Sequence, residues 1–151
     1  MHKRLTPDAR LPDLAAAQCG LISAEQAMAL GLSRESVRRL VRQSHWTRLS
    51  RGVYDTTPGA DGINKRIWAA ALRAGDPCAV GGEAALLLYG LDRRVDRIVI
   101  WTPDERHPRS APEVHLRRDH IGRLAHRRDP LPRIRAEDAV IDVAEHLRIE
   151  N

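Results

Sequence analysis

GLSRESVRRLVRQSHWTRLSRGVY, residues 31–54, is the stretch of sequence that decides the fold. Ser33 is a typical N-cap residue, and the pattern after it predicts a helix over 34–43. The apolar residues of that helix fall in one stripe, at about 100° per residue: Val37, Leu40 and Val41. The opposite face carries Glu35, Arg39 and Arg42, with Arg38 on the flank and Arg34 in the first turn. The stretch therefore predicts an amphipathic helix with a buried apolar side and a basic outer side.

Two shorter helices are predicted upstream. Residues 13–19 form the first, and residues 23–30 form the second. Ser23 and Gln26 stand three residues apart, as in a capping box, and fix the start of the second helix. Gly31 ends it, because glycine readily adopts the left-handed conformation after a helix. The polar residues 1–12 are expected to form a flexible arm.

A β-hairpin is predicted downstream, over residues 45–54. This segment alternates apolar and polar residues, has aromatic members and contains a Ser-Arg-Gly turn. Three short helices followed by a hairpin are the order of a winged helix-turn-helix, in which the third helix enters the DNA major groove. We therefore assign residues 13–56 to such a domain and residues 57–63, which contain Pro58, to a linker.

The rest of the chain is expected to form a small α+β domain over residues 64–151, so the fold class is α+β. Helices are predicted over residues 64–74, 82–89 and 136–147, and strands over residues 97–101, 113–117 and 131–135. The pair Gly81-Gly82 lacks the Lys-Ser/Thr of a phosphate-binding loop and is interpreted as a helix start against a close neighbour. The two cysteines, Cys19 and Cys78, are interpreted as separate buried thiols.

Positive charge is concentrated in two blocks. The chain carries a net charge of +5, and arginine outnumbers lysine by 23 to 2. A GC-rich genome also favours arginine, so the position of the charge says more than its total. Residues 1–60 hold 9 basic and 5 acidic side chains, a net +4, and residues 106–128 hold 7 and 2, a net +5. Six arginines and one glutamate lie between residues 34 and 51, and arginine suits both phosphate and the guanine edge.

A family resemblance rests on the same residues. It is carried by LIS at 21–23, ALGLS at 29–33, VRRLV at 37–41 and WTRLSRGVY at 46–54. Together these resemble the N-terminal domain of the AbiEi abortive-infection antitoxins, over about residues 13–55. Later pieces are also similar to that group: WAAAL at 68–72, Ala84-Ala85 with Tyr89-Gly90-Leu91, and AVIDVA at 139–144.

The resemblance implies the antitoxin half of a type IV toxin–antitoxin pair, which represses its own operon by binding double-stranded DNA. The matching toxin would be a nucleotidyltransferase that the antitoxin counters without direct contact. By position, the DNA contacts would be Ser33, Arg34, Arg38, Arg39 and Arg42 in the third helix, with Arg48 and Arg51 in the hairpin. The operator sequence and the oligomeric state stay open.

Two other functions are compatible with the sequence. Some relatives continue into an endonuclease-like domain, so the chain is either a short form or the DNA-targeting module of an endonuclease-like protein truncated after residue 151. Reading the gene past Asn151 separates these. A winged helix that binds protein is the second, and it predicts that replacing the six arginines leaves function intact.

No enzyme, metal or cofactor is expected. His115, His120 and His126 are separated by five and six residues, which fits neither helical nor strand ligand spacing, and neighbouring arginines would repel a cation. The basic stretch around them is either a surface that touches phosphate or a solvated loop. No apolar run approaches the roughly 20 residues of a membrane span, and no signal peptide is apparent, so a cytoplasmic location is expected.

Overall fold

The computed structural model describes residues 8–91, 94–103, 105 and 111–149, and the fold is α+β, as predicted. The chain divides into two units, Met1–Arg73 and Ala74–Asn151, and each is considered by itself. None of the helices in the described part of the chain is long and apolar enough to cross a bilayer.

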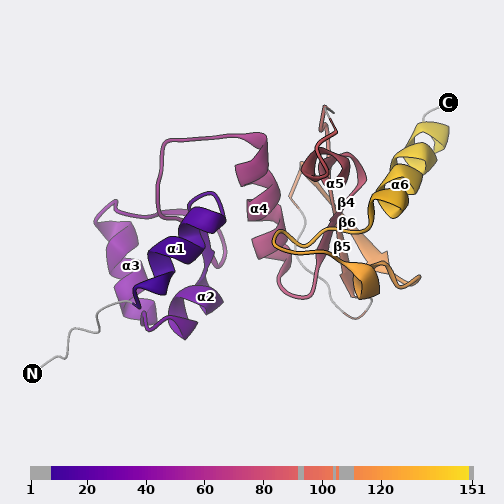
Figure 1. The fold of residues 1–151 in the computed structure, drawn as a ribbon. Coiled ribbons are helices and arrows are strands. Elements are labelled where there is room, and N and C mark those ends of the chain that lie inside the picture. Colours follow the sequence, from indigo (N-terminus) through magenta and orange to yellow (C-terminus); the bar gives the residue numbers. More distant parts are fainter. Residues whose placement is uncertain (1–7, 92–93, 104, 106–110, 150–151) are drawn as a thin grey trace, which may run out of the picture. The chain divides into compact units, whose positions relative to one another are not determined.

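The first unit has the winged helix-turn-helix order of elements (Figure 1). The elements are α1 (Arg10–Ala17), β1 (Leu21–Ser23), α2 (Ala24–Ala29), α3 (Arg34–Arg42), β2 (Thr47–Ser50), β3 (Val53–Asp55) and α4 (Ile63–Ala74). The three strands form an antiparallel sheet with β3 in the centre, in the order β1-β3-β2. The predicted hairpin is confirmed, whereas β1, only three residues long, was missed.

Helix α1 begins at Arg10, three residues before the predicted start at residue 13. The Asp8 carboxylate accepts the backbone N–H of Arg10 at 2.9 Å and pairs with its guanidinium at 2.6 Å. Pro12 lies in the first turn, where its missing N–H has no helical partner to lose. Residues 10–12 are therefore helical, and residues 1–7 of the expected arm lie outside the described part of the chain.

One apolar cluster joins α1, β1, α2 and α3. Its buried members are Leu11, Ile22, Ala27, Leu32, Val37 and Trp46, with Leu40, Val41 and Tyr54 among the partly buried residues packed around it. The Trp46 and Tyr54 rings lie 6.1 Å apart between centroids. The predicted apolar stripe of the third helix is therefore confirmed as the side of α3 that faces the core.

The caps of α2 are those that the sequence predicts. Ser23 Oγ accepts the N–H of Gln26 at 3.1 Å, and the Gln26 side chain accepts the N–H of Ser23 at 3.0 Å. Gln26 also exchanges hydrogen bonds with the buried side chain of Gln18, at 2.9 and 3.0 Å. Gly31, with φ of +93°, follows the helix as expected. These bonds fix the start of α2 to the end of α1.

The second unit is a three-stranded sheet with helices. Its elements are β4 (Ala79–Gly81), α5 (Gly82–Leu88), β5 (Ile98–Pro103), β6 (Val114–Asp119), the 3-10 helix η1 (Arg123–His126) and α6 (Ala136–Ile149). In the order β4-β5-β6, β4 is antiparallel and β6 parallel to β5. Of the three predicted strands, 97–101 and 113–117 are confirmed within a residue or two at each end.

The predicted strand over residues 131–135 is wrong. The structure places β4 in the sheet instead, and the 131–135 segment meets it only at an isolated bridge between Val80 and Arg133. Val80 donates to Pro132 O at 2.7 Å and accepts from Ile134 N at 3.0 Å. The prolines at 130 and 132 have no N–H to donate, which explains why no longer ladder forms.

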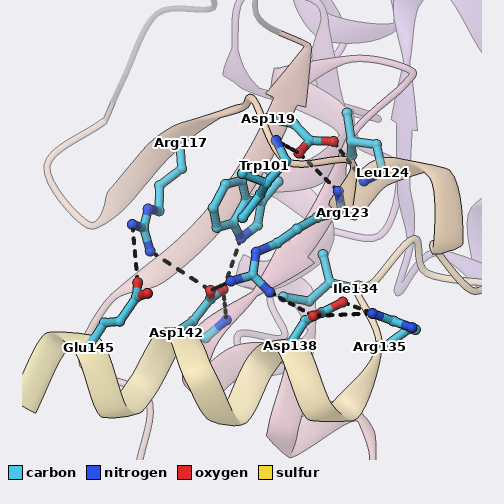
Figure 2. Close-up of polar contacts among 12 residues, drawn as sticks. Trp101, Arg117, Asp119, Arg123, Leu124, Ile134, Arg135, Asp138, Asp142 and Glu145 are labelled. Carbon is cyan, nitrogen blue, oxygen red and sulfur yellow. Dashed lines mark hydrogen bonds and ion pairs between the residues drawn. The ribbon is translucent and has the colours of Figure 1, made fainter.

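Trp101 of β5 lies at the centre of a buried polar network (Figure 2). Its Nε1 donates to Asp142 Oδ2 at 2.9 Å, and the guanidiniums of Arg117 and Arg123 lie over its ring at 4.7 and 4.9 Å. Gly81 passes so close that a Cβ there would lie 2.6 Å from Trp101 Nε1. The interpretation of Gly81-Gly82 as a helix start beside a close neighbour is confirmed, since α5 begins at Gly82.

Arg123 ties this network to α6. Its guanidinium pairs with Asp138 at 2.9 Å and Asp142 at 3.0 Å, and its side chain is 6% exposed. The turn that presents Arg123 is held by Asp119, whose carboxylate accepts the N–H groups of Arg123 and Leu124 at 2.9 and 2.8 Å. Burial alone would raise the pKa of Asp119, but these backbone hydrogen bonds outweigh it and lower the pKa.

A cavity of about 400 Å³ lies between α6 and the strands β5 and β6. His115 lines it together with Arg97, Arg117 and His146. Partial burial and then the charges of these three neighbours lower the pKa of His115 below its ordinary value of 6.5.

We expect Arg123→Ala to destabilise the second unit. Removing one partner of a buried ion pair leaves the other charge uncompensated, at a cost of about 3–5 kcal/mol. The matched control is Arg135→Ala, which removes an exposed partner of the same Asp138 and should cost about 1 kcal/mol or less. Chemical denaturation followed by circular dichroism measures both. Equal losses in the two variants would contradict the assigned role of Arg123.

His115 should titrate below pH 6.5. The folded protein favours the neutral imidazole of His115 more than the unfolded chain does. The free energy of unfolding therefore has its full value above pH 6.5, and it decreases as the pH falls from 6.5 toward the pKa of His115 in the folded protein. Arg97→Gln removes a nearby charge and should raise the midpoint of the His115 titration. Arg127→Gln changes an arginine outside the cavity lining and should leave this midpoint unchanged. Histidine resonances recorded against pH by NMR give the midpoints, and a wild-type value at or above 6.5 would contradict the assignment.

Candidate nucleic-acid interface

Helix α3 is held by a short turn after α2. Leu32 is buried, and its N–H donates to Ala27 O at 3.0 Å. Ser33 is the N-cap, because its Oγ accepts the N–H of Ser36 at 3.0 Å. The predicted start of the helix is confirmed, and the Ser33 hydroxyl is engaged in capping it. Placement of α3 thus follows from one buried leucine and one cap.

The arginines of α3 lie on its exposed side. With Val37 facing the core, the four arginines at 34, 38, 39 and 42 are all exposed. Arg34, Arg38 and Arg42 are spaced four residues apart, which places them one turn after another along one face. Four guanidiniums thus line the outer side of a helix only nine residues long.

Glu35 is the carboxylate among these arginines. Its Oε1 accepts a hydrogen bond from Arg42 Nη2 at 2.8 Å, and its Oε2 lies 4.0 Å from Arg38 Nη1. All three side chains are more than 60% exposed. Among the described residues, no carboxylate pairs with Arg34 or Arg39. Within the part of the chain that the structure describes, the guanidiniums of α3 are therefore bound to the exposed Glu35 or to no carboxylate, and none is held by a buried one.

The hairpin of β2 and β3, here called the wing, begins shortly after the end of α3. The N–H groups of His45 and Trp46 donate to Leu40 O at 3.0 and 3.2 Å, and Trp46 enters the core. Thr47 then starts β2, which pairs with β3 through Thr47 to Asp55 and Arg48 to Tyr54. These bonds fix where the wing leaves α3.

Two arginines occupy the wing. Arg48 lies on the edge strand β2, and Arg51 lies in the turn beside Gly52, whose φ is +76°. Both side chains are exposed. The register shifts between Arg48 and Ser50, and Leu49 at this bulge is 46% exposed. The wing thus presents two guanidiniums and one apolar side chain to solvent.

Strand β1 anchors the wing from its other side. Ser23 pairs with Val53, and the N–H of Ala24 at the start of α2 donates to Gly52 O at 2.9 Å. The turn of the wing is therefore bound to the first residue of α2. The helix pair and the wing share one hydrogen-bonded framework.

All seven candidate DNA-contact residues lie on α3, its cap or the wing, and all are exposed: Ser33, Arg34, Arg38, Arg39, Arg42, Arg48 and Arg51. Their role in DNA contact stays a prediction. No contact with DNA is predicted from the sequence for Glu35 or Leu49. Glu35 was recognisable from its spacing of three and seven residues to Arg38 and Arg42, whereas the bulge at Leu49 leaves no signal in the sequence.

The second basic block is divided by the structure. Arg117 and Arg123 turn inward onto Trp101 and Asp142, while Arg127 and Arg128 are exposed. Residues 106–110 of this block lie outside the described residues. The inward pair reduces the charge that this stretch presents to a phosphate backbone.

The three histidines that were considered as metal ligands lie on different elements. His115 lies on β6, His120 in the turn after it and His126 in η1, and the described residues contain no cluster of three or more potential ligands. The cysteine interpretation is half correct. Cys78 is buried, but Cys19 is exposed, because it follows the end of α1 in a left-handed conformation with φ of +57°.

Comparison with known proteins identifies one matching family. A search of curated proteins gave no match for the chain. Residues 9–54 match a family model described as transcriptional regulator, AbiEi antitoxin. This range runs from α1 to the middle of β3 and contains every candidate DNA contact, so the family resemblance is confirmed over this segment. Residues 9–54 are therefore similar to the transcriptional regulators of the AbiEi antitoxin family.

Proposed function

We propose that the chain is a sequence-specific DNA-binding repressor of the AbiEi antitoxin type, which regulates its own toxin–antitoxin operon. The observation that carries the proposal is the exposure of six arginines between residues 34 and 51 on a winged helix-turn-helix. In proteins with this element order, the third helix enters the major groove of duplex DNA, which supports the proposal. The family match over residues 9–54 supports a regulatory role.

The two arginine groups have different tasks in this proposal. The arginines of α3 read bases, because an arginine donates two hydrogen bonds to the O6 and N7 atoms of guanine. Arg48 and Arg51 of the wing contact phosphates or the adjacent minor groove, which positions the domain without reading sequence. The counterions displaced from DNA make binding weaken steeply with salt.

The proposal includes a wider setting, which the family resemblance implies. The protein acts in the cytoplasm on DNA upstream of its own gene. Its toxin is a nucleotidyltransferase, which it opposes without direct contact. In this proposal α3 is the recognition helix. Ser33 contributes as its N-cap, at the N-terminal end that enters the groove.

Arg39→Ala should relax base preference. Arg39 is exposed on α3, and a lost bidentate contact to guanine costs about 1–3 kcal/mol of discrimination at one base pair. Gel shifts with DNA upstream of the gene and with duplexes changed at single base pairs measure this loss. Arg94→Ala, which removes an exposed arginine of the second unit, serves as the control and should bind as wild type does. No retardation of the upstream DNA by wild type at low salt would refute the proposed function.

Arg51→Ala should weaken binding to all duplexes alike. A phosphate contact carries no sequence information, and its loss lowers the slope of log K against log salt by about 1. Fluorescence anisotropy with specific and scrambled duplexes at several salt concentrations measures the slope. A loss confined to the specific duplex would show that Arg51 reads bases instead.

A further inference from the structure

We propose that Glu35 is a specificity-determining residue, which selects a C·G base pair by accepting a hydrogen bond from the cytosine N4 amino group. This inference rests on the proposed function, since it concerns the sequence that the DNA-binding face prefers. Glu35 is the only acidic residue between 34 and 51. A carboxylate there weakens the attraction of this surface to phosphates, so it opposes binding to DNA of arbitrary sequence.

The fold depends little on Glu35, which lies in the first turn of α3, where the helix dipole favours a carboxylate only slightly. Its side chain is 64% exposed and contacts the likewise exposed Arg42 and Arg38. Exposed ion pairs of this kind contribute little to stability. The helix already has a cap at Ser33 and a buried face at Val37. Glu35 is thus available for binding.

The Glu35–Arg42 pair has the chemistry of one base pair. Glu35 presents an acceptor, and Arg42, 2.8 Å away, presents donors beside it. In the major groove, cytosine offers its N4 amino group as a donor, and guanine offers O6 and N7 as acceptors. A carboxylate and a guanidinium held side by side therefore complement a C·G pair, or a cytosine and a guanine in adjoining pairs.

The same carboxylate rejects other sequences. Where no amino group meets Glu35, its negative charge enters a groove bordered by phosphates with only Arg42 and Arg38 to compensate it. A buried charged acceptor that lacks one of its hydrogen bonds is costly. Glu35 also restrains Arg42 in the free protein, which reduces the number of guanidiniums free to bind any phosphate. Both effects lower the affinity for random DNA relative to the preferred site.

The test uses the full chain, wild type and Glu35→Gln, with selection from a pool of random duplexes followed by affinity measurements. For wild type, replacing the selected C·G pair by T·A should lower affinity about 5- to 100-fold. In Glu35→Gln this penalty should fall below about twofold or shift toward adenine, the base that glutamine prefers. Affinity for scrambled DNA should rise about two- to fivefold.

Two further variants make the result specific. Glu35→Ala should lose the same preference, and its thermal unfolding reports whether α3 remains folded. Glu137→Gln changes an exposed first-turn glutamate of α6 and should bind as wild type does. If both Glu35 variants keep the wild-type preference at every position, the inference is wrong while DNA binding stands. If wild type retards no duplex, the proposed function fails, and the assignment of Glu35 fails with it.

Discussion

Burial of one face of α3 is the constraint on which the candidate interface depends. Val37 packs with residues of α1, β1 and α2, and Leu40 and Val41 cover the edge of the same cluster. A helix rotated to bury its arginines would bring several charges out of water, at a cost far above the total stability of a small domain. The apolar stripe therefore determines which way the guanidiniums face.

The two units use arginine in opposite ways. In the first unit, the guanidiniums of α3 and the wing are exposed and are paired with Glu35 or with no carboxylate of the described residues. In the second, Arg123 is buried between Asp138 and Asp142 and lies over the Trp101 ring. Arginine suits both settings because its flat, weakly hydrated guanidinium stacks on aromatic rings and forks onto carboxylates or phosphates. Net charge alone could not distinguish these uses.

Local signals explain which parts of the fold were predictable. The ends of α2 and α3 are indicated by residues that bond within a few positions of themselves, namely Ser23, Gln26, Gly31 and Ser33. The sequence therefore predicts both helices to within one residue. Strands β1 and β4 have three residues each, and they exist because a distant partner strand completes them. The segment 131–135 is the opposite case, in which a local pattern misleads. Its alternation of apolar and polar residues predicts a strand, but its prolines prevent one from forming. The early start of α1 depends on Asp8, outside the predicted helix.

The candidate site likewise has features that the local sequence predicts and features that only the structure shows. Exposure of the arginines followed from the period of Val37, Leu40 and Val41 alone. The pairing of Arg42 with Glu35 was recognisable from their spacing on one helix. The outward turn of Leu49 required three-dimensional information, because a bulge depends on the register of two strands. The inward turn of Arg117 and Arg123 could not be predicted either, since their shared carboxylate partner, Asp142, lies 25 and 19 residues further along the chain.

The position of β2 at the edge of its sheet has a consequence beyond DNA. An unpaired strand edge is a template on which a second chain can add a strand, and such addition leads to aggregation. Arg48 on that edge and the bulge after it oppose this, since charge and a broken register both discourage strand addition. The wing thus carries its own protection against self-association, in the same few residues that are exposed to solvent.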